Sequence, residues 1–131
     1  MQTLNIRTTQ AREMLDITRK VQAMLNSLDL QDGALLVFVP HTTAGVTINE
    51  NADPSVQHDM LADLERLIPH RQPYYRHMEG NSDSHLLSTL VGSSVLVPVE
   101  EGRLVLGTWQ GIYFCEFDGP RTRKVVLQAL G

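Results

Sequence analysis

The chain has 131 residues, of which 42% are hydrophobic and 20% are charged. This length and balance fit one globular domain over residues 1–131 with a real core, and they exclude a disordered tail. The formal net charge of -4 argues against a protein that binds nucleic acid non-specifically, because such proteins carry a basic excess. The single cysteine, Cys115, excludes an intrachain disulfide framework, and its aromatic neighbours favour a buried structural role.

Neither a signal peptide nor a membrane span is expected. Residues 1–10 hold a single basic residue and no apolar core, and no apolar run along the chain is long enough to cross a bilayer. One local basic cluster stands out near the end of the chain, formed by Arg121, Arg123 and Lys124. We therefore expect a cytoplasmic protein without nucleic-acid or membrane partners, in which this cluster has a local role.

The first quarter of the chain predicts two strands followed by a helix. Apolar and polar residues alternate over residues 1–9, and a shorter strand is plausible over residues 14–17. Thr18 would cap a helix whose apolar residues recur at helical spacing. The dipeptide Asp32-Gly33 would end this unit with a turn.

A buried strand and a polar loop come next. Residues 34–39 form a continuous apolar run, which predicts a central strand buried on both faces. The sequence His41-Thr42-Thr43-Ala44-Gly45 follows after Pro40, and polar residues at the end of a buried strand are commonly presented to a cleft. A further strand through Val46 and Ile48 would then deliver Asn49-Glu50-Asn51.

A second helix is expected to start at Asp53-Pro54, with Asp53 as the N-cap and Pro54 in the first helical position. The apolar residues that would form its buried stripe are Val56, Met60, Leu64, Leu67 and Ile68. Asp59 lies one residue before this stripe, at the boundary where a side chain could face a site. Its simpler role is to complement the helix dipole.

The densest group of chemical side chains is the run from His77 to His85, which holds two histidines, two carboxylates, an amide and two hydroxyls. The apolar residues that follow this run recur at helical spacing and predict a third helix, with Ser82 or Asp83 as N-cap and His85 in the first turn. The positive end of the helix dipole favours a neutral imidazole there. First-turn N–H groups bind anions, and Gly80 lets the backbone approach a ligand closely.

The last third of the chain is rich in strands. Val95, Val97 and Val99 alternate with other residues, and Glu100-Glu101-Gly102 predicts a hairpin turn. Further strands are expected over residues 112–117 and 124–130, with a bend around Trp109 between two glycines. Two or three helices among strands that form hairpins predict the α+β class, with mixed or antiparallel sheets.

Several blocks of this sequence together resemble a known family. They are His41-Thr42-Thr43-Ala44, Asn49-Glu50-Asn51 with Asp53-Pro54, His58-Asp59-Met60, the run from His77 to His85, and Gly102 with Gly107-Thr108-Trp109-Gln110. The match is to the YjbQ-like family, often labelled "secondary thiamine-phosphate synthase". The resemblance implies an α+β sandwich that assembles as a homotrimer, with a polar site built from the histidines. It also implies the joining of a pyrimidine diphosphate to a thiazole phosphate, as a secondary activity.

Two pictures of that site remain open. In the first, His41, His77 and His85 bind a divalent metal such as zinc or magnesium, and Glu50 or Glu79 is a ligand or orients one. The spacing matches no zinc signature such as H-E-x-x-H. In the second picture there is no metal, and a histidine and Glu50 serve as acid and base. His41, Glu50, Asp59 and His85 are the candidate catalytic residues.

The candidate substrate-binding residues are Thr42, Asn51, Gly80, Asn81, Ser82, Trp109, Gln110 and Arg121. The turn from Gly80 to Ser82 would hold a phosphate. Trp109 would stack on a flat ring, although a large core residue is the simpler interpretation. Arg121 would clamp phosphate, as would Arg123. Alternatively, these two arginines would pair with Asp118 and Glu116.

Three functions remain open. The first, which the resemblance implies, is an enzyme with thiamine-phosphate-synthase-like activity on a phosphorylated small molecule. The second is a metal-assisted hydrolase of a phosphorylated small molecule, with water as the second substrate. The third is a non-enzymatic trimeric protein that binds a metal or ligand, in which the histidines are structural.

Overall fold

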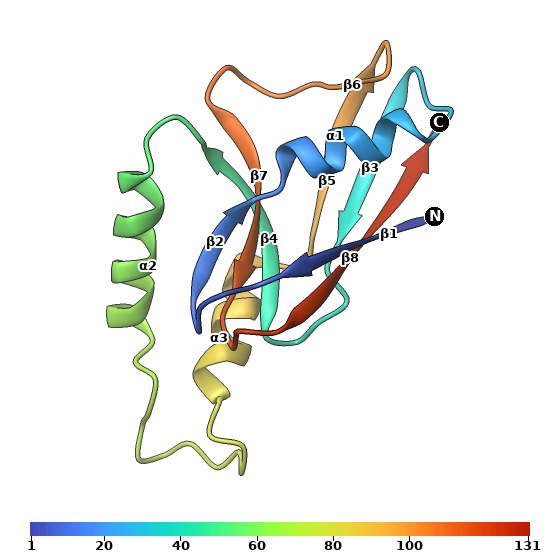
Figure 1. The fold of residues 1–131 in the computed structure, drawn as a ribbon. Coiled ribbons are helices and arrows are strands. Elements are labelled where there is room, and N and C mark those ends of the chain that lie inside the picture. The colour runs from blue at the N-terminus through green and yellow to red at the C-terminus, as the bar shows by residue number, and fades with distance from the viewer.

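The computed structural model describes residues 1–131 and shows two antiparallel β-sheets with three helices (Figure 1). The strands are β1 (Gln2–Arg7), β2 (Glu13–Asp16), β3 (Gly33–Phe38), β4 (Ala44–Glu50), β5 (Ser94–Glu100), β6 (Arg103–Leu104), β7 (Gln110–Glu116) and β8 (Thr122–Leu130). The helices are α1 (Thr18–Asn26), α2 (Ser55–Leu67) and α3 (Ser82–Val91). The α+β class is confirmed, and every strand pair is antiparallel rather than mixed.

The main core lies between the two sheets and α1. One sheet has five strands in the order β1-β8-β3-β5-β6, and the other has three in the order β2-β7-β4. A cluster of 16 buried hydrophobic residues fills the space between them. In β3, Leu35 and Val37 point into this core, whereas Phe38 is 39% exposed. The prediction that this strand is buried on both faces is therefore wrong, because no helix covers its outer face.

The strand covered on both faces is β7 instead. Every residue from Gly111 to Phe117 is buried. Ile112 and Phe114 face the main core, while Tyr113, Cys115 and Phe117 pack with Leu87 of α3 in a second cluster. This alternation, with apolar partners on both sides, explains why the strand is hydrophobic from Ile112 to Cys115.

Helix α2 lies to one side of the sheets (Figure 1), and its apolar stripe is not buried as predicted. The one buried residue of α2 is Gln57, and Leu67 is 70% exposed. Met60, Leu64 and Leu67 line an apolar groove instead, together with Leu90 of α3. None of the three helices has the length and apolar character needed to span a membrane.

Helix α3 is held on the three-stranded sheet by hydrogen bonds from its buried serines. Ser84 Oγ donates to the carbonyl of Phe117 at 2.7 Å, and Ser88 Oγ donates to the carbonyl of Ala44 at 2.7 Å. The C-terminal end of the helix lies so near β4 that a Cβ on Gly45 would sit 2.5 Å from the carbonyl oxygen of Gly92. These contacts place the N-terminus of α3 beside the β3–β4 and β7–β8 loops.

Candidate functional site

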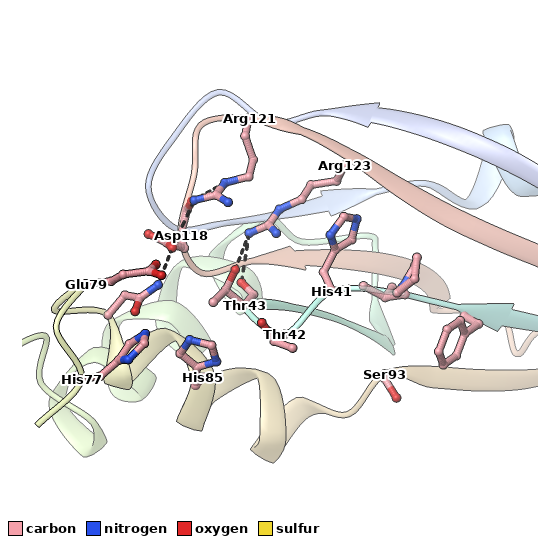
Figure 2. A pocket seen from close by; sticks show the side chains of 14 residues that line it. His41, Thr42, Thr43, His77, Glu79, His85, Ser93, Asp118, Arg121 and Arg123 are labelled. Atoms are coloured by element: carbon pink, nitrogen blue, oxygen red, sulfur yellow. Dashed lines mark hydrogen bonds and ion pairs between the residues drawn. The ribbon is translucent and has the colours of Figure 1, made fainter. Parts of the chain in front are cut away.

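A polar cleft of about 690 Å³ opens where the β3–β4 and β7–β8 loops meet the N-terminus of α3 (Figure 2). Its lining includes 14 residues, of which only two are hydrophobic. The predicted site residues found in it are His41, Thr42, His77, Asn81, His85 and Arg121. The cleft thus joins side chains from three regions that are far apart in the sequence.

His77 and His85 form a pair in the cleft. Their ring centroids are 5.4 Å apart and the rings are nearly perpendicular, at 84°. His85 belongs to the first turns of α3, where its backbone N–H donates to the carbonyl of Asn81 at 3.4 Å. His77 is exposed and belongs to the loop before the helix. The sequence run thus brings its two histidines together through the turn at Gly80, which has a φ of 72°.

His41 is held in one tautomer by the backbone of β8. Its Nε2 accepts the N–H of Lys124 at 2.9 Å. Because a backbone N–H can only donate, the neutral ring carries its own proton on Nδ1. Burial lowers the pKa of His41, and the charge of Arg123 lowers it further, against a smaller opposing effect of Glu116. His41 therefore presents an N–H donor rather than a free lone pair.

A buried ion pair lies beneath the cleft and joins the two sheets. Glu116 ends β7 and Arg123 is the second residue of β8, and their side chains are 0% and 2% exposed. The Nε of Arg123 donates to Glu116 Oε1 at 2.8 Å, and its Nη2 donates to Oε2 and to Thr43 Oγ1. Glu116 also accepts hydrogen bonds from Thr8 Oγ1 at 2.8 Å and from the Asp118 N–H at 2.9 Å.

The hydrogen bonds decide the protonation of Glu116. Burial alone would raise its pKa, but the donors of Arg123, Asp118 and Thr8 outweigh burial and hold the pKa below its ordinary value. The pairing of Arg123 with Glu116, one of the two roles predicted for it, is thereby confirmed. Arg123 also lines the cleft.

Arg121 is paired as well, but at the surface. Its Nη2 donates to Asp118 Oδ2 at 3.1 Å and its Nε to the Asp118 carbonyl at 2.9 Å. The side chain is 50% exposed. Asn81 Nδ2 donates to the same Asp118 oxygen at 2.9 Å. Arg121 therefore remains accessible from the cleft, while Asp118 links it to the start of α3.

The predicted metal ligands share the cleft, but they do not form a three-ligand set within one chain. No group of three or more His, Cys, Asp or Glu side chains is arranged to hold a metal ion. The Nε2 of His41 is already engaged by Lys124. His77 and His85 alone provide fewer ligands than a catalytic zinc site uses. A divalent metal at this site stays a prediction.

Two predicted catalytic carboxylates lie outside the cleft. Glu50 ends β4, whereas the cleft lies at the start of that strand, and six residue steps of strand separate the two by about 20 Å. Asp59 is on the exposed part of α2, 3.1 Å from His58 Nδ1, and lines the apolar groove. Neither of these carboxylates serves the cleft within this chain.

Five of the predicted substrate-binding residues do not line the cleft. Asn51 follows β4 and its side chain is directed toward Asp16. Trp109 is 63% exposed, so it is neither a core residue nor part of the cleft. Gln110 Oε1 accepts the N–H of Gly107 at 2.8 Å, so this oxygen is used within the turn that joins the two residues. Gly80 and Ser82 flank Asn81 in the chain but do not line the cleft.

The sequence interpretation missed the burial and pairing of Asp83. It is 1% exposed, its Oδ2 accepts a hydrogen bond from Arg12, and His70 Nδ1 lies 3.1 Å away. Asn81, rather than Ser82 or Asp83, is the N-cap of α3. No local pattern pointed to this contact, because Arg12 and Asp83 are 71 residues apart in the chain.

Cys115 has the structural role expected from its neighbours. It is 1% exposed, and burial raises the pKa of its thiol to about 12. Since the thiolate is the reactive form, Cys115 is not a nucleophile at neutral pH.

The fold and the cleft define a small α+β protein with one polar site lined by histidines and arginines. The chain belongs to the UPF0047 protein YjbQ-like family, whose profile matches residues 2–131. It is similar to the UPF0047 protein YugU of Bacillus subtilis, with 55% identity over 131 residues, covering 100% of this chain and 99% of the relative. A UPF0047 protein of Methanocaldococcus jannaschii is 48% identical over 126 residues, covering 96% of this chain and 91% of the relative.

Solved structures agree with this assignment. An uncharacterized conserved protein of the family from Clostridium acetobutylicum has a TM-score of 0.95 and 46% identity, covering 99% of this chain and 100% of that chain. A conserved hypothetical protein from Thermus thermophilus has a TM-score of 0.93 and 45% identity, covering 99% and 100%. The resemblance read from the sequence is confirmed. The names of these relatives state no activity.

Proposed function

We propose that the protein is an enzyme that acts on phosphorylated small molecules in this cleft. The observation that supports the proposal is the gathering of three histidines and two arginines in one polar depression. Guanidinium and imidazole N–H groups donate strong hydrogen bonds to phosphate oxygens. Imidazoles also transfer protons near neutral pH. A purely structural set of histidines would have no need of such a large open cleft.

The reaction we propose is the one that the family resemblance implies. The ring nitrogen of a thiazole phosphate attacks the methylene carbon of a pyrimidine diphosphate, and a C–N bond forms as the C–O bond to pyrophosphate breaks. The departing pyrophosphate gains negative charge, which the Nδ1–H of His41 and the guanidinium of Arg121 would stabilise. His77 or His85 would donate a proton to the leaving oxygen.

A second candidate is hydrolysis of a phosphorylated small molecule. The stacking contact predicted for Trp109 is not made in the cleft, because Trp109 lies outside it, although the ring of Phe38 does line the cleft. The cleft does have an open polar lining, which admits water. The two reactions differ in one respect: condensation requires the thiazole phosphate, whereas hydrolysis proceeds without it.

The experiment that tests the proposal follows pyrophosphate release from the pyrimidine diphosphate with and without the thiazole phosphate. We expect release to depend on the thiazole phosphate and to match the thiamine phosphate formed. Release of phosphate or pyrophosphate without the thiazole would assign the protein to the hydrolase class instead. Elemental analysis of the same sample, and assays with EDTA, zinc and magnesium, test the predicted metal. Light scattering tests the predicted homotrimer.

A further inference from the structure

The segment that joins α2 to α3, residues 69–80, is exposed along almost its whole length. Gln72 and Tyr75 are half-buried, and every other residue of the segment is exposed. Tyr74 and Met78 are 72% and 99% exposed. Figure 1 shows this segment, here called the α2–α3 loop, extending away from both sheets. Few packing contacts therefore restrain it.

The α2–α3 loop is held to the protein at its two ends. Near its start, His70 Nδ1 lies 3.1 Å from Asp83 Oδ2, which is the one side-chain hydrogen bond between the loop and the rest of the chain. Near its end, the ring of His77 lies against the ring of His85. The backbone hydrogen bonds of the loop join its own residues to one another. No hydrogen bond therefore ties residues 71–76 to the rest of the protein.

Gly80 provides a hinge where the loop meets α3. Its φ is 72°, and a Cβ placed there would meet no atom within 4 Å. Glycine adopts a wide range of backbone angles, and here no neighbouring group limits that freedom. Loops that close over a site turn about a few terminal positions of this kind.

The loop carries arginines that have no partner in the structure. Neither Arg71 nor Arg76 takes part in an ion pair. Arg76 is the neighbour of His77, which lines the cleft, but Arg76 itself does not line it. A guanidinium binds phosphate through two parallel hydrogen bonds. A rotation of the loop toward the cleft would give Arg76 such an acceptor whenever a phosphorylated ligand is bound.

We propose that residues 71–79 close over the cleft when a phosphorylated ligand binds, and that closure brings the guanidinium of Arg76 onto the phosphate. This inference rests on the proposed function, because the ligand supplies the acceptor that Arg76 lacks. His70, bound to Asp83, keeps one end of the loop in place, and Gly80 is the hinge at the other. Closure excludes bulk water from the cleft. It therefore favours attack by a second organic substrate over hydrolysis.

The test measures how fast a thiol placed on the loop reacts before and after ligand is added. Met78→Cys puts the thiol where the native side chain is 99% exposed, while Cys115 is 1% exposed and stays unreactive. The whole protein is treated with a chromogenic disulfide reagent, alone and saturated with inorganic pyrophosphate or with the pyrimidine diphosphate. We expect saturation to slow labelling about tenfold or more, because the open state is then a minor population.

The control for a change elsewhere in the protein is Leu96→Cys. Leu96 is 58% exposed on β5 outside the cleft, so its labelling should not depend on ligand. Combining Met78→Cys with Arg76→Gln should weaken pyrophosphate binding about tenfold in calorimetry, as loss of a charge-assisted hydrogen bond gives, and should abolish the protection at saturation. Combining Met78→Cys with Arg71→Gln, at the anchored end of the loop, should change neither.

The outcomes separate this inference from the proposed function. Pyrophosphate and pyrimidine diphosphate that bind without slowing the labelling of Met78→Cys overturn the inference alone, as does equal protection of Leu96→Cys. Labelling of Met78→Cys that is already slow without ligand means that another copy covers the loop, and it also overturns the inference. Should Met78→Cys fail to fold, trypsin cleavage of the wild type after Arg76 gives the same readout. If neither compound binds the wild type, the proposed function itself fails.

Discussion

Replacing Arg123 with methionine is expected to destabilise the protein by about 3–5 kcal/mol, because it leaves the carboxylate of Glu116 buried without its counter-charge. The loss should appear as a lower midpoint in urea unfolding followed by circular dichroism. The size of the effect reflects the burial of both partners, whose side chains are 2% and 0% exposed.

The matched control for this variant is Arg121→Met. Arg121 also pairs with a carboxylate, Asp118, but its side chain is 50% exposed, so we expect a loss below about 1 kcal/mol. The double variant Glu116→Leu/Arg123→Met should recover much of the loss, since no buried charge remains at these two positions. Equal destabilisation by Arg121→Met and Arg123→Met would contradict this account of the ion pair.

The same pair predicts how stability responds to acid. The folded-state pKa of Glu116 lies below its ordinary value of 4.5, so the unfolded chain binds the proton more readily than the folded protein does. The stabilisation is therefore complete above the ordinary pKa and is lost as pH falls through the lower folded value. In Glu116→Gln this acid-dependent loss should be smaller, which unfolding curves between neutral pH and acid would measure.

His85→Ala is expected to reduce the rate of the enzyme by about 100-fold or more while leaving the fold intact, because a positioned proton donor contributes on that order. The His85 side chain does not hold α3 in place. The buried side chain of Leu87 packs the helix against the sheet, and Ser84 and Ser88 bind it there by hydrogen bonds. Circular dichroism and light scattering should match the wild type.

The control for His85→Ala is His58→Ala. His58 is 81% exposed on α2 and contacts Asp59 outside the cleft, so its removal should change neither rate nor stability. If His85→Ala unfolds the protein or changes its oligomeric state, the histidine has a structural role. The non-enzymatic function would then be the better description.

The fold class and two segments that line the cleft could be predicted, because each depends on a pattern among neighbouring residues. Alternating strands, the run from His77 to His85, and the polar loop after β3 each depend on neighbouring residues. The inward direction of the Arg123 side chain also has a local signal, because alternate residues of a strand face the same side and Val125 and Leu127 are buried.

The errors arose where sequence proximity was taken for spatial proximity. Glu50 was placed with His41 because the two are close in the chain, yet β4 separates them along its whole length. The exposure of Trp109 has no local signal, because it depends on which elements fold over that turn. The Asp83–Arg12 contact joins residues 71 positions apart and follows only from the tertiary arrangement that brings the first turn of α3 beside the residue before β2.

Pyrophosphate release by the wild type, His58→Ala and folded His85→Ala, measured side by side with the pyrimidine diphosphate and the thiazole phosphate, tests the central claim most directly. We predict equal release by the wild type and His58→Ala and a loss of about 100-fold or more in His85→Ala. Release that is unchanged in His85→Ala, or absent from the wild type, would contradict the proposal that this cleft is the active site of such an enzyme.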